Sequence, residues 1–342
     1  MIRRLLVTGA ATLGSVAATR AIGRRAARRL LEAPRTAPDE ASLGPAIDAL
    51  GGEVVRLRAR DGLRLAARWL PRDATGDPDA AGGGSAWVAD AHEAILLLHG
   101  YSGSIAPVLV EYGPFLRRTA GVLGLDFRGH GDSADGPSTF GLLEVEDIAG
   151  ALAWMGERGI TRVALVGTSM GGISAIAAVA VLGDGSLAAA DADPHAPRAA
   201  VAPPRPRIVA VVGDSVAPDL EIPIANRLSG PLRRFTAARL FDGAASLLGA
   251  DLRATEPSRV IGLVDPVPVL LIHGEDDRTV PIADGRRLAA LAGPATESWI
   301  VPGAGHSEAH AVAGQDYERR VVDFVRMAFE AARREDADRD GD

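Results

Sequence analysis

The stretch Arg162-Val-Ala-Leu-Val-Gly-Thr-Ser-Met-Gly-Gly172 decides the fold class of this chain of 342 residues. Residues 163–166 form a short, continuously apolar run, which is typical of a strand buried on both faces of a parallel sheet. The run leads into Gly167-Thr-Ser169-Met-Gly171, and an alanine-rich helical segment follows directly. This G-x-S-x-G order predicts a sharp turn that exposes the hydroxyl of Ser169 at the end of the strand. Ser169 is therefore the candidate nucleophile, and the alternative is a tight turn whose serine only caps the helix.

Further strands and helices are indicated on both sides of this turn. Continuously apolar runs recur at 94–98, 122–125, 208–212 and 267–272. Segments of helical period lie between them, as at 142–158, and one follows the last run at 283–291. Residues 53–60 and 63–70 instead alternate apolar and polar residues around Asp61-Gly62, which predicts a two-stranded hairpin at a sheet edge. The chain is expected to form an α/β domain with helices on both faces of the sheet.

A serine hydroxyl becomes a good nucleophile only when a histidine takes its proton. Of the seven histidines, His306 ends the stretch Val301-Pro-Gly-Ala-Gly-His306, directly after a predicted strand at 297–301. A loop in that position lies at the carboxyl edge of the sheet, where it can reach Ser169. His306 is therefore the predicted base, and His310, about one helical turn later, is the alternative.

The histidine in turn needs a carboxylate that holds its tautomer and stabilises the imidazolium. The loop after the run 267–272 offers Glu275, Asp276 and Asp277, of which we select Asp277. The alternative is Asp214, at the end of the preceding apolar run. The resulting chain order of serine, aspartate and histidine differs from the two main orders of serine proteases.

The oxyanion formed during acyl transfer must be met by preorganised hydrogen-bond donors. The stretch Leu97-Leu-His-Gly-Tyr-Ser-Gly103 ends an earlier strand with a glycine-rich turn that can present backbone amides. We assign the oxyanion hole to the amides of Tyr101 and Met170.

These stretches together resemble the α/β-hydrolase superfamily, in particular its bacterial serine hydrolases of the prolyl-oligopeptidase-like type. The matching motifs are His99-Gly100, Asp126-Phe-Arg-Gly-His-Gly-Asp-Ser133, 167–172, His273-Gly274 with Asp277, and Gly303-Ala-Gly-His306. The resemblance implies a mainly parallel sheet of eight strands in a domain at 53–334, with an ester- or amide-cleaving site. Because the turn carries serine and not aspartate, haloalkane dehalogenases and epoxide hydrolases are disfavoured. Two segments depart from the usual pattern: a low-complexity loop at 183–207, and a helical cap at 218–265 that carries apolar Leu and Phe residues.

Composition excludes several other kinds of chemistry. The chain has no cysteine and no lysine, which removes thiol nucleophiles, cysteine metal sites, Schiff bases and Walker phosphate loops. We expect neither a cofactor nor a metal. The net charge is −7, although residues 1–35 hold eight arginines and one glutamate, so the rest of the chain is strongly acidic. An acidic body repels phosphates, and nucleic acid is therefore not an expected partner.

The ends of the chain differ from the domain in composition. Residues 1–31 combine an apolar run at 5–19 with arginines at spacing four, which favours a basic amphipathic helix on an anionic membrane surface. A secretory signal and a leader without a role are alternatives; the arginine block disfavours secretion, so we expect a cytoplasmic or membrane-associated protein. Residues 32–52 are interpreted as a linker, and the acidic residues 335–342 as a disordered tail.

The sequence thus predicts a serine hydrolase that cleaves a small carboxylic ester through an acyl-enzyme. The Leu and Phe residues of the cap suggest an apolar acyl pocket, although they could equally be core. A peptidase or an acyltransferase with the same three residues is the first alternative. A non-catalytic, membrane-associated binding module is the second.

Overall fold

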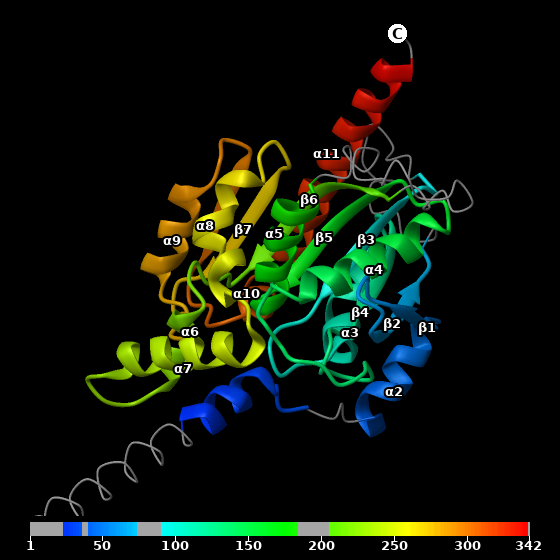
Figure 1. Ribbon diagram of the computed structural model, residues 1–342. Coiled ribbons are helices and arrows are strands. Elements are labelled where there is room, and N and C mark those ends of the chain that lie inside the picture. The colour runs from blue at the N-terminus through cyan, green and yellow to red at the C-terminus, as the bar shows by residue number, and fades with distance from the viewer. Residues whose placement is uncertain (1–22, 36–39, 74–89, 184–204, 341–342) are drawn as a thin grey trace, which may run out of the picture.

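The computed structural model describes residues 23–35, 40–73, 90–183 and 205–340, which surround a single sheet of eight strands (Figure 1). The strands are β1 Glu53–Arg58, β2 Arg64–Leu70, β3 Glu93–Leu98, β4 Gly121–Leu125, β5 Arg162–Thr168, β6 Arg207–Asp214, β7 Val269–Gly274 and β8 Thr296–Val301. Their order across the sheet is β1-β2-β4-β3-β5-β6-β7-β8. β1 and β2 form the predicted edge hairpin, and the other six strands, β3 to β8, run parallel to one another.

The continuously apolar runs are central strands, as the sequence predicts. Every residue of β3, β4, β5 and β7 is buried. A strand covered on both faces has no solvent side, so its sequence is apolar without alternation. β1 is an edge strand and alternates instead, with Val55 and Leu57 buried between exposed neighbours.

Helices cover both faces of the sheet, which confirms the predicted α/β architecture. α4 Glu144–Gly156, α5 Met170–Leu182 and α9 Ile282–Leu291 pack on one face, and in Figure 1 α4 and α5 lie in front of the sheet. α3 Ile105–Leu116, α10 Ala309–Ala313 and α11 Gln315–Asp340 pack on the other face. Each face has its own apolar core, and β5, whose side chains alternate between Leu165 and Val166, contributes to both.

The segment between β6 and β7 contains no strand and forms the cap. It consists of α6 Glu221–Arg227, α7 Arg233–Leu248, η2 Leu252–Thr255, α8 Pro257–Val260 and η3 Ile261–Leu263. Phe241 of α7 is fully buried and joins the core on this side of the sheet. The other departure from the family pattern, the loop at 183–207, lies largely outside the described residues.

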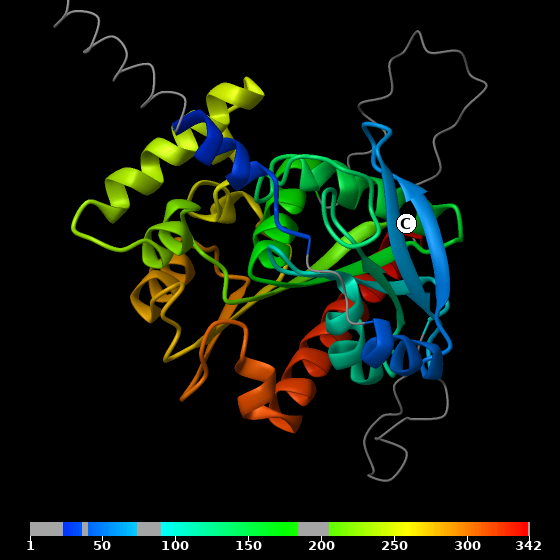
Figure 2. The same ribbon diagram turned by 90° about the horizontal axis from the view of Figure 1, so that it is seen from below.

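The described part of the N-terminal segment, residues 23–31, forms a helix, in agreement with the expected amphipathic helix. It is not a free leader, because its Ala27 and Leu31 are buried against the cap and the domain. Its association with a membrane stays a prediction. Figures 1 and 2 both show this helix beside α7. The apolar run at 5–19 lies outside the described residues.

The segments predicted as a linker and as a disordered tail both contain helix among the described residues, so the expected disorder of the tail is wrong as far as Asp340. Residues 32–52 contain α2 Glu40–Ala49, which packs on α3 and buries Ile47. The tail continues α11 as far as Asp340. Glu335 pairs with Arg207, and Asp336 accepts a hydrogen bond of 2.7 Å from Arg162, so two sheet arginines neutralise the acidic segment. Within the described ranges no helix is long and apolar enough to cross a membrane.

Candidate active site

The turn between β5 and α5 holds Ser169 in a rare backbone conformation. Its φ is 49° and its ψ is −113°, and its side chain makes no capping hydrogen bond to α5. The alternative that Ser169 merely caps the helix is therefore wrong. A Cβ at position 171 would lie 2.4 Å from the carbonyl oxygen of Leu98, and one at 167 would lie 2.3 Å from the backbone of Gly171. Both glycines are thus needed for the close approach of strand and helix.

The structure brings the three predicted residues together in one hydrogen-bonded chain. His306 Nε2 lies 3.0 Å from Ser169 Oγ, and His306 Nδ1 lies 2.7 Å from Asp277 Oδ2. An ionised carboxylate only accepts, so Nδ1 carries the hydrogen and the lone pair of Nε2 faces the serine hydroxyl. This is the tautomer in which an imidazole can take a proton from serine.

The carboxylate of Asp277 is held from the side opposite His306. Its side chain is fully buried, and its Oδ1 accepts hydrogen bonds of 2.8 Å from the amides of Thr279 and Val280. His273 contacts the carbonyl of Val280 through Nε2 at 2.7 Å, so it bonds the same loop. Glu275 and Asp276, the other acids of this loop, are exposed to solvent.

The glycine-rich loop at 99–103, which we call the oxyanion loop after its predicted role, lies directly against Ser169. A Cβ placed on Gly100 would be 3.5 Å from the Cβ of Ser169. Tyr101, Met170, Ser169 and His306 all line one cavity of about 270 Å³ at the carboxyl edge of the sheet. Both predicted donor residues therefore reach the site.

The wall of this cavity is mainly apolar and comes from segments far apart in the sequence. It includes Leu30 of the N-terminal helix, Phe140 of the loop after β4, and Pro223 and Ile224 of α6. The Leu and Phe residues of the cap do not line it, so the expectation that they form the pocket is wrong. Leu232 and Phe235 point to solvent and are 68% and 59% exposed.

Two hydrogen bonds join the N-terminal helix to the cavity wall, and backbone carbonyls of the helix accept both. The hydroxyl of Tyr101 donates a hydrogen bond of 3.1 Å to the carbonyl of Leu30, and the ring of Tyr101 stacks on Phe140 at 4.9 Å. The amide of Ser138 donates a hydrogen bond of 2.7 Å to the carbonyl of Leu31. Sequence reasoning missed this contribution, because nothing in the leader's composition indicates where it docks.

Two buried, neutral histidines hold the oxyanion loop in place through hydrogen bonds. His99 Nδ1 donates to the carbonyl of Gly100 at 2.8 Å and its Nε2 accepts from the amide of Phe127 at 3.1 Å. His130 Nδ1 donates to the carbonyl of Arg128, and its Nε2 accepts from the amide of Ser102 at 3.3 Å. Burial lowers the pKa of His99 to about 3 and also lowers the pKa of His130. Both rings therefore stay neutral and keep one donor and one acceptor.

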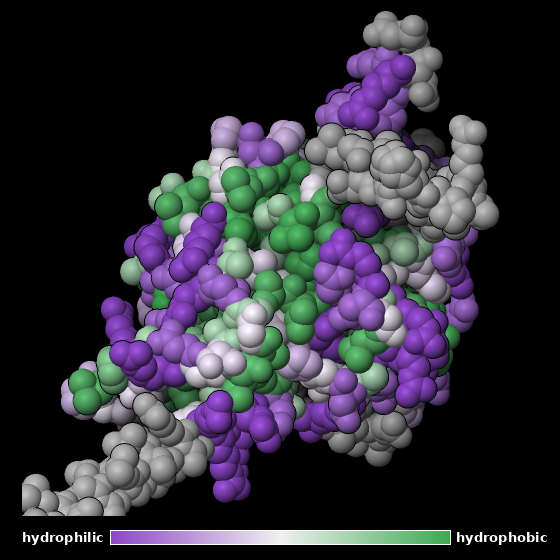
Figure 3. Space-filling model, in the orientation of Figure 1, coloured by the Kyte–Doolittle hydropathy of each residue, from purple (hydrophilic) through white to green (hydrophobic). Residues whose placement is uncertain are grey.

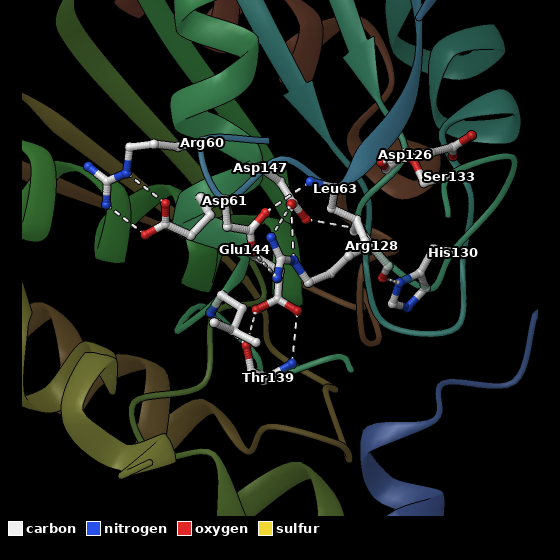
Figure 4. Close-up of polar contacts among 12 residues, drawn as sticks. Arg60, Asp61, Leu63, Asp126, Arg128, His130, Ser133, Thr139, Glu144 and Asp147 are labelled. Atoms are coloured by element: carbon white, nitrogen blue, oxygen red, sulfur yellow. Dashed lines mark hydrogen bonds and ion pairs between the residues drawn. The ribbon is translucent and has the colours of Figure 1, made fainter. Parts of the chain in front are cut away.

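A buried ion-pair network supports the loop that follows β4. Figure 4 shows the guanidinium of Arg128 between Asp147 of α4, at 2.7 Å, and Asp61, at 2.9 Å. Nearby, Glu144 accepts hydrogen bonds from the amide and the hydroxyl of Thr139 at 2.8 and 2.7 Å. These contacts hold the segment that carries Phe140 into the cavity wall.

Asp214, the alternative acid, does not bond to His306. Its carboxylate is fully buried and accepts hydrogen bonds from the hydroxyls of Ser215 at 2.9 Å and Tyr317 at 3.2 Å. Burial raises the pKa of Asp214 to about 6. Ser215 Oγ accepts in turn from the amide of Ser307, the residue after His306, at 2.9 Å.

The alternative base, His310, also lies away from Ser169. Its ring nitrogens contact Glu111 of α3 at 2.8 Å and Glu318 of α11 at 3.3 Å. The hydrogen bond with Glu111 raises the pKa of His310. His310 thus joins three helices, and the structure places it outside the Ser169 cavity.

Strained backbone is concentrated around the site. Among the described residues, the five non-glycine residues with positive φ are Ser102, Phe140, Ser169, Ser215 and Ser307. Each one belongs to the oxyanion loop, the cavity wall, the turn or the Asp214 network. Such conformations cost of order 1–3 kcal/mol each and persist where the surroundings hold them, typically at functional sites. Within the same residues, no three His, Asp or Glu side chains converge as a metal site would require.

This chain belongs to the alpha/beta hydrolase family, whose model matches residues 95–323. The uncharacterized protein YfhR of Escherichia coli strain K12 is 27% identical over 296 residues, which cover 85% of this chain and 86% of YfhR. The esterase Pf2001 of Pyrococcus furiosus has a similar structure, with a TM-score of 0.56 at 19% identity over 86% of this chain and 98% of its own. A membrane phospholipase A described as a bacterial virulence factor has a TM-score of 0.54 at 17% identity, over 96% of this chain and 99% of its own. The narrower resemblance to prolyl-oligopeptidase-like hydrolases stays a prediction.

Proposed function

We propose that this protein is a serine hydrolase that cleaves carboxylic esters through an acyl-enzyme. The observation that carries the proposal is the position of His306, whose two ring nitrogens contact Ser169 at 3.0 Å and Asp277 at 2.7 Å. These are the contacts that a nucleophile, its general base and an orienting carboxylate require.

In the first step, Ser169 Oγ attacks the acyl carbon of the ester while His306 Nε2 takes the hydroxyl proton. The carbonyl oxygen becomes an oxyanion, which accepts hydrogen bonds from the amides of Tyr101 and Met170. The bond from the acyl carbon to the alcohol oxygen then breaks, and His306 returns the proton to that oxygen. Asp277 stabilises the imidazolium throughout and keeps its own charge.

In the second step, a water molecule gives one proton to His306 and attacks the acyl carbon of the Ser169 ester. The second oxyanion uses the same two amides. Its collapse breaks the bond to Ser169 Oγ, which regains the proton from His306, and the carboxylic acid leaves.

The cavity favours a substrate with an apolar acyl group. Its volume of about 270 Å³ is near the lower end of the usual range for ligand pockets, and Leu30, Phe140 and Ile224 supply apolar wall. Solved structures described as esterases share the fold, which favours an ester over a peptide. A peptidase or acyltransferase would use the same three residues.

The test is hydrolysis of p-nitrophenyl esters of increasing acyl length by the wild type and by Ser169→Ala. Ser246→Ala, which changes an exposed serine of α7, is the matched control. We expect turnover in the wild type and the control, and a loss of about 10⁴-fold or more in Ser169→Ala. Circular dichroism checks that all three proteins are folded.

Two outcomes would overturn the proposal. A folded wild type that is silent on every ester would remove the esterase assignment and favour peptide substrates or a binding role. Turnover that survives in Ser169→Ala would show that another group is the nucleophile.

A further inference from the structure

The N-terminal helix and the tip of the cap form one surface beside the active-site cavity. The helix covers residues 23–31, and the tip, which we define as residues 227–242, contains the end of α6 and the first turns of α7. Ala27 of the helix packs at Gly243 of α7, where a Cβ would lie 3.0 Å away. Figure 2, which views the molecule from below, shows the two helices side by side.

Charge on this surface has the opposite sign to the rest of the chain. Residues 23–35 and 227–242 hold nine arginines but only two acidic residues, Glu32 and Asp242, whereas the whole chain carries −7. Among the described residues, six of these arginines are exposed and form no ion pair: Arg24, Arg25, Arg28, Arg29, Arg233 and Arg234. Such a cluster of cations in an acidic protein favours an anionic partner.

Two large apolar side chains project from the same surface. Leu232 is 68% exposed and Phe235 is 59% exposed, next to Arg233 and Arg234 at the start of α7. Figure 3 shows apolar surface at this end of α7 with hydrophilic surface around it. Exposed apolar residues rimmed by arginines are the pattern of a segment that lies in the headgroup region of a bilayer.

The same elements that carry this surface also wall the cavity. Leu30, on the N-terminal helix, and Ile224 and Arg227, on α6, line the cavity that holds Ser169 and His306. A bilayer that contacts the surface would therefore lie next to elements that wall the site.

We infer that this basic and apolar surface docks on an anionic lipid bilayer, and that the ester substrate is a lipid ester drawn from that bilayer. The second part of the inference rests on the proposed ester hydrolysis. The first part is a binding property and stands without it. An acidic protein is the other partner that the arginines could fit, but it would not explain two exposed apolar side chains beside a hydrolase cavity.

The experiment uses the full chain with two double variants of the tip. Arg233→Glu/Arg234→Glu reverses charge, and Leu232→Asp/Phe235→Asp removes the apolar contacts; all four side chains are exposed and none lines the Ser169 cavity. The matched controls are Arg118→Glu/Arg286→Glu and Met327→Asp, which change exposed residues elsewhere. Four quantities are measured. Two concern binding: sedimentation with phosphatidylcholine vesicles with or without an equal part of phosphatidylglycerol, and binding to polyglutamate. Two concern catalysis: hydrolysis of a long-chain fluorogenic ester embedded in those vesicles, and hydrolysis of p-nitrophenyl butyrate in solution.

We expect the wild type to bind the anionic vesicles at least tenfold more tightly than the zwitterionic ones. Both tip variants should lose about tenfold or more in anionic vesicle binding and in hydrolysis of the embedded ester. Hydrolysis of p-nitrophenyl butyrate should stay within twofold of the wild type, and the control variants should match the wild type in every assay.

The outcomes separate this inference from the proposed function. A wild type that binds anionic vesicles but hydrolyses neither ester would remove the proposed function and the lipid substrate, and would leave the docking surface supported. A wild type that hydrolyses p-nitrophenyl butyrate while its tip variants bind vesicles as tightly as the wild type would overturn the docking surface. If the arginine variant loses binding to polyglutamate but not to vesicles, the surface is a protein-docking site and the inference is wrong.

Discussion

The amide of Ser307 donates a hydrogen bond of 2.9 Å to the hydroxyl of Ser215, which ties the residue after His306 to the end of β6. Both residues have positive φ, 59° and 58°. Ser215 in turn donates to the buried carboxylate of Asp214. The His306 loop is therefore held from β6 as well as by Asp277, and this second support sets where the imidazole lies.

Removal of the Ser215 hydroxyl should slow catalysis without weakening substrate binding. In Ser215→Ala the amide of Ser307 loses its acceptor, which costs about 1–1.5 kcal/mol. We expect kcat to fall about tenfold and KM to stay within twofold. Steady-state kinetics on a p-nitrophenyl ester measure both, and an unchanged kcat would mean that the bond does not position His306.

Asp277→Asn should have a much larger effect on the rate. An asparagine amide can donate to Nδ1 of His306 and so favour the wrong tautomer, and it does not stabilise the imidazolium; the expected loss of kcat is about 10⁴-fold. Asp276→Asn, on the same loop but exposed, is the matched control and should keep the wild-type rate. Equal losses in the two variants would contradict the role of Asp277.

The raised pKa of Asp214 predicts a pH-dependent stability. Burial raises this pKa from 3.8 to about 6, so the folded state binds a proton more tightly than the unfolded state. The contribution of Asp214 is therefore fully present below pH 4 and is lost as the pH rises through about 6. Asp214→Asn carries no charge, so its free energy of unfolding should gain about 2–3 kcal/mol relative to the wild type between pH 4 and pH 7. Urea unfolding of both proteins across this range measures the difference, and curves that stay parallel would contradict the prediction.

The approach of β3 to the turn should make position 171 intolerant of any side chain. In Gly171→Ala the new Cβ would lie 2.4 Å from the carbonyl oxygen of Leu98, and backbone must shift. We expect a loss of about 2–4 kcal/mol in the free energy of unfolding, and a loss of activity because Ser169 moves with the turn. Gly44→Ala is the control, since a Cβ there meets nothing within 4 Å. A stable, active Gly171→Ala protein would contradict the described turn.

The central strands and the three residues around Ser169 could be predicted because local sequence determines them. The strand at 162–168 is apolar throughout since both its faces are covered, and the glycines at 167 and 171 are required by contacts of under 2.5 Å. His306 and Asp277 follow strands whose carboxyl ends meet at one edge, so topology alone brings them together.

What could not be predicted depends on contacts between distant segments. Leu30 lines the cavity only because its helix packs on α7, and the acidic end of α11 is helical where Arg162 and Arg207 neutralise it. Phe235 has the periodicity of a core residue, yet it is exposed. Periodicity indicates an apolar face but not what covers it.

The proposed acyl-enzyme is tested most directly by trapping it. The wild type is mixed with a p-nitrophenyl ester and quenched during the first turnover, and the mass of the protein and of its peptides is measured. We predict a burst of about one p-nitrophenol per protein molecule and an added mass of one acyl group on Ser169, both of which are absent in Ser169→Ala. Turnover without an adduct, or an adduct on another residue, would contradict the mechanism.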